Sequence, residues 1–246
     1  MRPLEIIKQK RRFYMFSEKT KDAVLEVNSF FGKYNMQFEE KIKKTFIYYD
    51  TPNYDLQKSN IVLFKTQIGS FCELNMATER VSTTSRYTLR TNSKHYKKQI
   101  RSYESPLKYG TFLINNFKSM FMSSINFDPE FLLKKLRPVY CIQTKSMEYR
   151  STNITGLKIT YSFDSDKYTN YENGVVVKNN ILTIYQHSGE QTNENFEDLI
   201  NKLNHYCKEL TPTTETKIMI ARKCTQSRPV APVKEDKKKK DKKNKK

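Results

Sequence analysis

The residues best suited to carry chemistry in this sequence are alternating cations near its start. Lys8, Lys10 and Arg12 occupy every second position. On a β-strand all three would project from one face, because successive side chains point to opposite sides of a strand. One interpretation is an anion-binding interior wall, and the other is the solvated face of an edge strand, where charged side chains deter aggregation. Further cations that could join such a wall are Arg101, Lys145, Lys158 and Lys217.

Sequence motifs of several other chemistries are missing. The six glycines never form GxGxxG or GxxxxGK, so the sequence has no glycine-rich phosphate cradle. The four cysteines lie far apart without a Cys-x-x-Cys pair, which predicts reduced thiols in an intracellular protein rather than a zinc cluster. No histidine has metal-ligand spacing, and no GxSxG elbow is present. Asp164-Ser165-Asp166 lacks the DxDxDG continuation of a metal loop and is therefore predicted to be a solvated turn.

The chain of 246 residues is strongly basic, with 45 lysine and arginine residues, 26 acids and a formal charge of +19. This charge predicts a polyanionic partner. Residues 228–246 hold ten lysine or arginine residues and three acids, and we expect a disordered tail there, after one folded domain over residues 1–227. Such a tail could bind nucleic acid, polyphosphate or an anionic membrane without sequence preference. The sequence has no secretory signal and no apolar run near the roughly 18 residues of a membrane span, so we expect a cytoplasmic protein.

The elements that must position these residues are mostly strands. Alternating or β-branched stretches predict strands near residues 4–14, 46–49, 60–65, 70–76, 139–149 and 157–163. Two more strands, 174–178 and 181–186, are expected to flank a turn at Asn179-Asn180, and a short strand is expected over 216–222. Helical spacing predicts helices over about 17–32, within 107–136 and around 196–203, whereas residues 78–98 are predicted to be extended or loop. This pattern favours an α+β fold, an antiparallel sheet or barrel decorated by helices.

The segment after the predicted 46–49 strand carries a family resemblance. Residues 48–56, YYDTPNYDL, and 58–63, KSNIVL, resemble the segment "YFDTPDxDLxxxGIxLRxR" of the CYTH and VTC domains, the triphosphate tunnel metalloenzyme superfamily. Residues 71–76, 136–139, 156–160 and 211–217 are similar, in the family's order, to its "yELTLK", "LxPV", "lRiTfD" and "fSKY" motifs. The resemblance extends over roughly residues 4–222 and is closest to the VTC-type polyphosphate polymerase domains.

The resemblance implies an eight-stranded antiparallel β-tunnel decorated by several helices. Its walls would carry arginines and lysines that hold a triphosphate or polyphosphate, and carboxylates that hold Mg²⁺ or Mn²⁺. Phosphoryl transfer depends mainly on positioning and charge neutralisation, which such a tunnel provides. Activities in the family include tripolyphosphatase, thiamine triphosphatase, adenylyl cyclase, RNA triphosphatase and polyphosphate polymerase.

The sequence departs from the family at the metal-binding positions. The family's first-strand "ExExK" is best matched by residues 8–12, KQKRR, so cations replace both glutamates. The late "lEiK" strand is matched by residues 182–185, LTIY, without its carboxylate. Lys158, Lys217 and Glu73 are retained, which leaves Glu73 as the metal-ligand candidate. Because divalent cations prefer carboxylate oxygens, these departures predict that the metal site is lost or strongly altered.

Three hypotheses for function follow. The first is a pseudoenzyme that binds phosphate polymers or triphosphate-bearing ligands in a basic tunnel, through Lys8, Lys10, Arg12, Arg101, Lys158 and Lys217. The second is an active metal-dependent polyphosphate polymerase or triphosphatase, with Mg²⁺ or Mn²⁺ held by carboxylates such as Glu73, Glu148 or Asp164. The third is a nucleic-acid-binding protein whose Tyr and Phe residues stack on bases, although the spacing of these residues favours core positions. The sequence leaves open whether the protein is an enzyme.

Overall fold

The strands of this protein form one strongly curved antiparallel sheet. The computed structural model describes residues 5–16, 21–33, 36–69, 71–78, 83–90, 134–151, 159–186 and 193–226. Within these residues the sheet has eight long strands and one short strand: β1 (Glu5–Phe16), β2 (Met36–Asp50), β3 (Ile61–Ile68), β4 (Phe71–Thr78), β5 (Thr83–Arg90), β6 (Arg137–Ser151), β7 (Ile159–Asn170), β8 (Val176–Gln186) and β9 (Thr211–Thr213).

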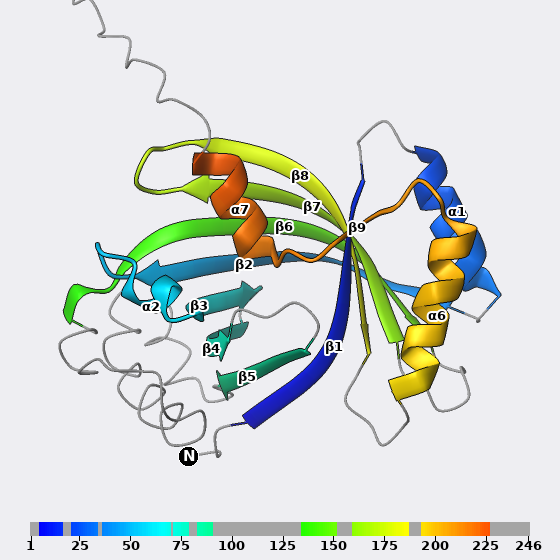
Figure 1. Ribbon diagram of the computed structural model, residues 1–246, viewed down its shortest axis with the longest axis horizontal. Helices are drawn as coiled ribbons and strands as arrows, with labels where there is room; N and C mark the ends of the chain where they lie inside the picture. The colour runs from blue at the N-terminus through cyan, green and yellow to red at the C-terminus, as the bar shows by residue number, and fades with distance from the viewer. Residues whose placement is uncertain are drawn as a thin grey trace, which may run out of the picture.

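The strand order makes the sheet curve around an interior. Neighbours follow the order β5-β4-β3-β2-β6-β7-β8-β1-β9, and β5 pairs with β1 as well. β1 achieves this by dividing its length: residues 5–10 pair with β5, and residues 10–16 pair with β8 (Figure 1). The predicted α+β fold, an antiparallel tunnel decorated by helices, is confirmed.

Two helices cover the outer face at one end of the sheet, because that face is apolar there. α1 (Lys21–Gly32) and α6 (Asn193–Tyr206) lie side by side over it (Figure 1), and Phe31 of α1 stacks on Tyr161 of β7 with ring centroids 4.3 Å apart. Phe196 and Leu203 of α6 join the same buried cluster. These two helices were predicted from their apolar spacing, and the structure confirms them. No described helix is long and apolar enough to cross a membrane.

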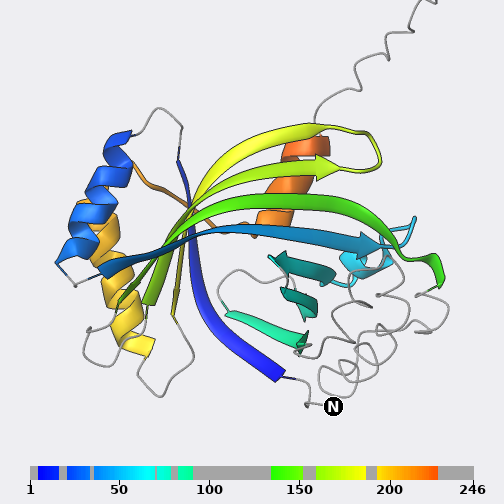
Figure 2. The ribbon, with the colours of Figure 1, turned by 180° about the vertical axis from the view of Figure 1, so that it is seen from behind.

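A third helix, α7 (Lys217–Gln226), lies on the inner side of the sheet. It is in front of β6 and β7 in Figure 1 and behind them in Figure 2. Ile218 and Ala221 of α7 are buried against inner-face residues such as Phe64, Ile142 and Tyr168. The strand predicted over residues 216–222 is therefore wrong: this segment is helical, and its helix anchors Lys217 in the interior.

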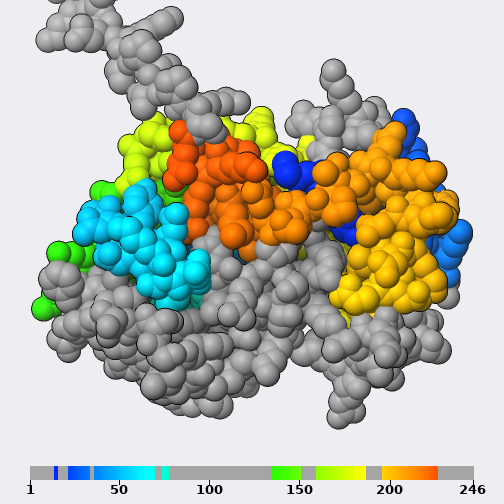
Figure 3. Space-filling model, viewed as in Figure 1, coloured from blue at the N-terminus to red at the C-terminus, as the bar shows by residue number. Residues whose placement is uncertain are grey.

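The turn between β2 and β3 is built by one carboxylate. Asp50 accepts backbone hydrogen bonds from Thr51 (2.8 Å), Leu56 (3.0 Å) and Gln57 (3.0 Å), which closes the turn and starts the short helix α2 (Asp55–Lys58). Burial raises the pKa of Asp50, and the backbone hydrogen bonds act in the opposite direction. α2 and α7 are neighbours on one face of the molecule (Figure 3).

Two other sequence predictions need correction. The strands predicted over 174–178 and 181–186 are one strand, β8, because Asn179 and Asn180 pair with Asp166 and Ser165 of β7. The chain reverses earlier, around Gly174, which adopts a positive φ of 68°. The strand predicted over 46–49 begins at residue 36, whereas β5 lies within the segment 78–98, which was predicted to be extended or loop. The helices predicted within 107–136 lie outside the described residues, apart from 134–136.

Candidate polyanion-binding site

The inner face of β7 carries a row of buried polar residues. Thr160, Ser162, Asp164 and Asp166 alternate with residues of the outer face, so all four face the interior. On the neighbouring strand β6, Thr144, Ser146 and Glu148 are also buried and lie opposite this row. The interior is therefore lined at this level by hydroxyl and carboxylate groups from two adjacent strands. The solvated turn predicted at residues 164–166 is wrong, since these residues lie within a strand.

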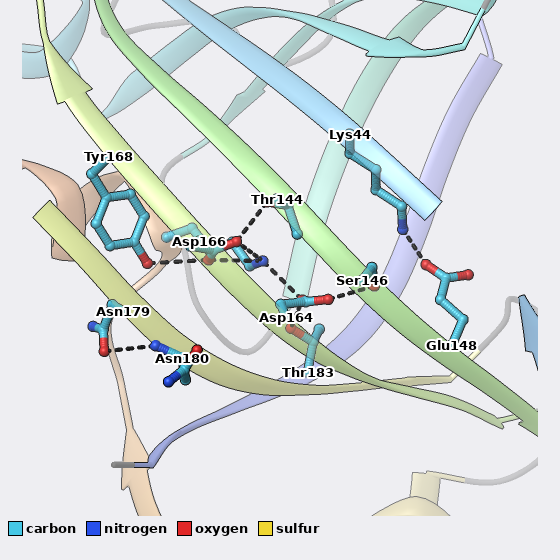
Figure 4. A network of polar contacts seen from close by, with 11 residues as sticks. Lys44, Thr144, Ser146, Glu148, Asp164, Asp166, Tyr168, Asn179, Asn180 and Thr183 are labelled. Carbon is cyan, nitrogen blue, oxygen red and sulfur yellow. Dashed lines mark hydrogen bonds and ion pairs between the residues drawn. The ribbon is translucent and has the colours of Figure 1, made fainter. Parts of the chain in front are cut away.

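Asp164 lies at the centre of this network (Figure 4). The Ser146 hydroxyl donates a hydrogen bond to its Oδ1 at 2.5 Å, and the Thr183 hydroxyl of β8 donates to its Oδ2 at 2.8 Å. The Lys217 ammonium group, brought by α7, donates to the same Oδ2 at 2.8 Å. Both oxygens of this buried carboxylate are thus already hydrogen-bonded by the protein itself.

Asp166 is held in a similar way, one pleat farther along β7. Its Oδ1 accepts hydrogen bonds from the Thr144 hydroxyl at 2.5 Å and from Lys217 at 3.1 Å. Its Oδ2 accepts from the Tyr168 hydroxyl at 3.1 Å and lies 3.0 Å from the Lys217 Nζ. One ammonium group therefore bridges two buried carboxylates whose side chains are 6% and 0% exposed.

The charges of this triad depend on one another. Burial alone would lower the pKa of Lys217, but the charges of Asp164 and Asp166 outweigh burial and raise it, so the ammonium group stays charged. Burial alone would raise the pKa of Asp164, and Lys217 outweighs this effect and lowers it. The pKa of Asp166 is raised, first by burial and then by the charge of Asp164, against the opposing effect of Lys217. The two buried carboxylates therefore share the charge of one ammonium group.

A second ion pair lies on the same inner face. Lys44 of β2 donates to the Glu148 Oε1 of β6, and the side chains are 20% and 6% exposed. Figure 4 shows this pair beside the Asp164 network. The sequence analysis named Glu148 and Asp164 as alternative carboxylates, and the structure places both on this inner wall. Lys44 was missed, because nothing in the sequence of β2 distinguishes it from Lys41 or Lys43.

The described residues do not fit a divalent cation as they stand. A hard cation needs several unoccupied carboxylate oxygens, whereas those of Asp164 and Asp166 accept hydrogen bonds from hydroxyls and from an ammonium group. Within the parts of the chain that the structure describes, no group of three His, Cys, Asp or Glu residues could hold a metal ion. In this arrangement Lys217 occupies the position between the carboxylates that a cation would take.

The register separates the predicted cations of β1 from this site. Tyr185 of β8 pairs with Thr160 of the inner face, and Arg11 pairs with Tyr185. Arg11 is therefore on the inner face, and the alternation of the strand puts Lys8, Lys10 and Arg12 on the opposite one. β1 is also not an edge strand, since it pairs with β5, β8 and β9.

Of the other predicted residues, Lys217 alone is seen in the interior with its contacts. Position 73 of β4 pairs with Thr66 of β3, and this register puts Glu73 on the inner face. Lys145 is exposed on the outer face, so it does not belong to an interior wall. Arg101 and Lys158 lie outside the described residues.

The register also brings to the inner face two arginines that the sequence analysis did not single out. Arg86 of β5 pairs with Ala77, which belongs to the interior cluster beneath α7, and Arg90 pairs with Glu73. With Arg11, these positions place three arginines on adjacent strands of the inner face. The signal that could have identified them is the alternation in TTSRYTLR, where residues 86 and 90 have the same parity.

Comparison with solved structures identifies the class of fold. HpAC1 from Hippeastrum, a candidate adenylyl cyclase described as having a dominant triphosphatase activity, matches with a TM-score of 0.56 at 11% identity, over 89% of this chain and 96% of that one. A candidate adenylate cyclase from Bacillus halodurans matches with a TM-score of 0.54 at 12% identity, over 87% and 96% of the two chains. The PH1819 protein from Pyrococcus horikoshii matches with a TM-score of 0.51 at 11% identity, over 88% and 99%. At this identity the likeness shows the fold alone, which is the antiparallel tunnel-like fold of these structures.

No protein-family model matches the sequence, and no curated protein matches it either.

Proposed function

We propose that this protein binds a triphosphate-bearing ligand or a phosphate polymer in its tunnel, without a resident divalent cation. The observation that supports this most directly is the charged Lys217, held in the interior at 2.8 Å from Asp164 and 3.0 Å from Asp166. An ammonium group has three N–H donors, and the two hydrogen bonds to these carboxylates leave one for a phosphate oxygen. Lys217 would thus contact the ligand while it remains anchored.

The neighbouring cations extend this site along the tunnel. Closely spaced phosphates need several positive charges, and arginine suits them because its planar group can bind two phosphate oxygens at once. Arg11, Arg86 and Arg90, placed on the inner face by register, are our candidates for this role, with Lys44 at the adjoining wall. Lys158 and Arg101 remain candidates on the strength of the sequence resemblance. Lys8, Lys10 and Arg12 are left out of the proposed site because of their register.

The comparisons support the choice of ligand. HpAC1 has this fold and is described as a triphosphatase, so a phosphate chain is a ligand that the fold can accommodate. Functions are not fixed by folds, however, and the proposal depends on the cations of this chain.

A thermal-shift titration of the full-length protein with tripolyphosphate tests the proposal. We expect saturable stabilisation that is the same with Mn²⁺ and with EDTA, and stabilisation at 100 times the Kd is worth about 2.7 kcal/mol. Sulfate at matched ionic strength is the control for nonspecific anion effects. The absence of a saturable shift in both conditions would overturn the proposal.

The second candidate is a metal-dependent triphosphate-processing enzyme. It is favoured by three buried carboxylates on two adjacent strands, Glu148, Asp164 and Asp166, which is an unusual number to bury for structure alone. These oxygens would become available to a cation only if Lys217 moved away. Tripolyphosphate stabilisation that requires Mn²⁺, together with release of inorganic phosphate, would select this candidate over the first.

A further inference from the structure

The outer face of the sheet has a second basic feature, away from the tunnel. Where α1 and α6 end, the outer face of β2, β6, β7 and β8 continues without a described helix over it, as Figure 2 shows from behind. Four exposed lysines lie on this part of the face. We call them the lysine row: Lys43 of β2, Lys145 of β6, Lys167 of β7 and Lys178 of β8.

The register makes the lysine row continuous across four strands. Lys43 pairs directly with Lys145, and Lys167 pairs directly with Lys178. Lys145 pairs with Ser165, two residues from Lys167, so these lysines are diagonal neighbours. Direct cross-strand neighbours are about 5 Å apart at Cβ, and diagonal ones about 7–8 Å, so each lysine is within one long side chain of the next.

Ordinary structural explanations do not account for the lysine row. Like charges placed directly opposite one another destabilise a sheet, and here two such pairs occur. Lysines on edge strands can prevent aggregation, but Lys145 and Lys167 lie where β6 and β7 are paired on both sides. Within the described part of the chain, none of the four lysines has an acidic partner within salt-bridge distance.

We propose that the lysine row binds the phosphate backbone of a single-stranded polynucleotide. Such a strand supplies evenly spaced negative charges that would relieve the repulsion between the lysines. The positions between the lysines carry hydroxyl and amide groups, which are common partners of phosphate and sugar oxygens. These groups belong to Thr45, Gln143, Ser165 and Asn180. Tyr140, Tyr161 and Tyr168 of β6 and β7 are buried and therefore unavailable for stacking on bases, and the exposed Tyr171 lies outside the lysine row, so we expect binding without base preference.

The end of the described chain favours the same partner. The Asn173 side chain, in the turn between β7 and β8, donates a hydrogen bond at 3.1 Å to the backbone carbonyl of Thr225 in the last turn of α7. Lys167 and Lys178 belong to the hairpin that this turn closes. The described chain therefore ends beside the turn of this hairpin, and the sequence that follows it has ten lysine or arginine residues over 228–246. A long flexible polyanion could contact both.

This inference concerns a different face from the tunnel and does not depend on the proposed function. The test uses the full-length protein and a fluorescently labelled 20-nucleotide RNA with a 5′-hydroxyl end, so that no triphosphate is present for the tunnel. Fluorescence anisotropy at several salt concentrations gives the Kd and its salt dependence. The face variant is Lys43→Gln, Lys145→Gln, Lys167→Gln and Lys178→Gln together.

A matched control variant removes the same charge elsewhere. Lys33, Lys134, Lys202 and Lys208 are exposed and lie outside the lysine row, and their combined change to Gln lowers the net charge equally. If each lysine of the row contacts one phosphate, the slope of log K against log salt falls by about 2.8 in the face variant, at about 0.7 per contact. We expect the control variant to keep the slope of the wild-type protein.

Three results would overturn the inference: equal weakening in both variants, which would mean attraction by net charge alone; unchanged RNA binding in the face variant; or wild-type binding to phosphatidylserine vesicles but not to RNA. Loss of RNA binding in the face variant, with tripolyphosphate binding unchanged, would support it. If the fourfold variant folds poorly, the double variant Lys43→Gln/Lys167→Gln provides the same test. It removes one lysine from each directly opposed pair with half the number of substitutions.

Discussion

Replacing Lys217 by Met gives the sharpest test of how the interior is held together. The change removes the ammonium group that bridges Asp164 and Asp166, whose side chains are 6% and 0% exposed, and keeps a side chain of similar length. Removing one partner of a buried ion pair costs about 3–5 kcal/mol, because an uncompensated charge is left behind. We expect the lower end of this range, about 3 kcal/mol at pH 7.5, since Asp166 can relieve part of the cost by taking up a proton.

Urea denaturation at pH 7.5 and pH 5 measures this cost. The loss should be smaller at pH 5, because the abandoned carboxylates become protonated more easily as the pH falls. The control is the triple variant Lys217→Met/Asp164→Asn/Asp166→Asn, which removes both signs of charge and should recover most of the loss. A loss below about 1 kcal/mol at pH 7.5, or a triple variant no more stable than the single one, would refute the ion-pair reasoning.

Three further predictions concern the apolar core, the stability of the protein at acid pH and the tunnel wall. Phe31→Ala should lower the free energy of unfolding by about 3–5 kcal/mol in urea, because Phe31 is fully buried against Tyr161; a loss near zero would contradict its place in the core. Because burial is outweighed by Lys217, the pKa of Asp164 is lowered from 3.8, so its contribution to stability is present above pH 3.8 and is lost as the pH falls below that value. Acid titration of Asp164→Asn should therefore show a flatter stability curve below pH 4, and identical curves would show that the pair contributes nothing. Arg86→Gln should weaken tripolyphosphate binding by about tenfold or more, as expected for a charge-assisted hydrogen bond, whereas Arg12→Gln should leave the Kd unchanged in the same titration; the reverse order would contradict the register argument.

Periodicity was sufficient to predict the elements whose two sides differ. The helices α1 and α6 have one apolar face, and the turn at Asp50 has a strong local signal, so both were predictable. The short apolar segment 218–221 was not, since its spacing suits a strand as well as a helix. Asp164 and Asp166 were predicted to lie in a solvated turn, whereas they lie in a strand, where aspartate is generally unfavourable. What permits them there is a set of hydroxyls and an ammonium group from Thr144, Ser146, Thr183 and Lys217.

The face of β1 that forms the tunnel wall could not be predicted from β1 itself. A shift of one residue exchanges its two faces, and both faces carry large apolar residues. Tyr14 contacts the helices outside, where its hydroxyl donates to Asn204 at 2.8 Å, while Met15 packs on the interior cluster. Because charged and apolar residues occur on both faces of β1, only the register with its partners in the sheet shows which of its cations belong to the inner face.

The pairing of β1 also determines the order in which the protein can be assembled. Of the described strands β1 is made first, yet its partners β8 and β9 lie near the other end of the described chain, as in the register pairs Lys10–Gln186 and Phe13–Thr213. Contacts between such distant segments fold slowly, because a long loop must close before they form. At about 5–20 residues per second, β1 leaves the ribosome many seconds before these partners. Residues 10–16 of β1 are therefore among the last to be paired, although residues 5–10 can pair earlier with β5, and chaperones that bind exposed strands have that interval in which to act.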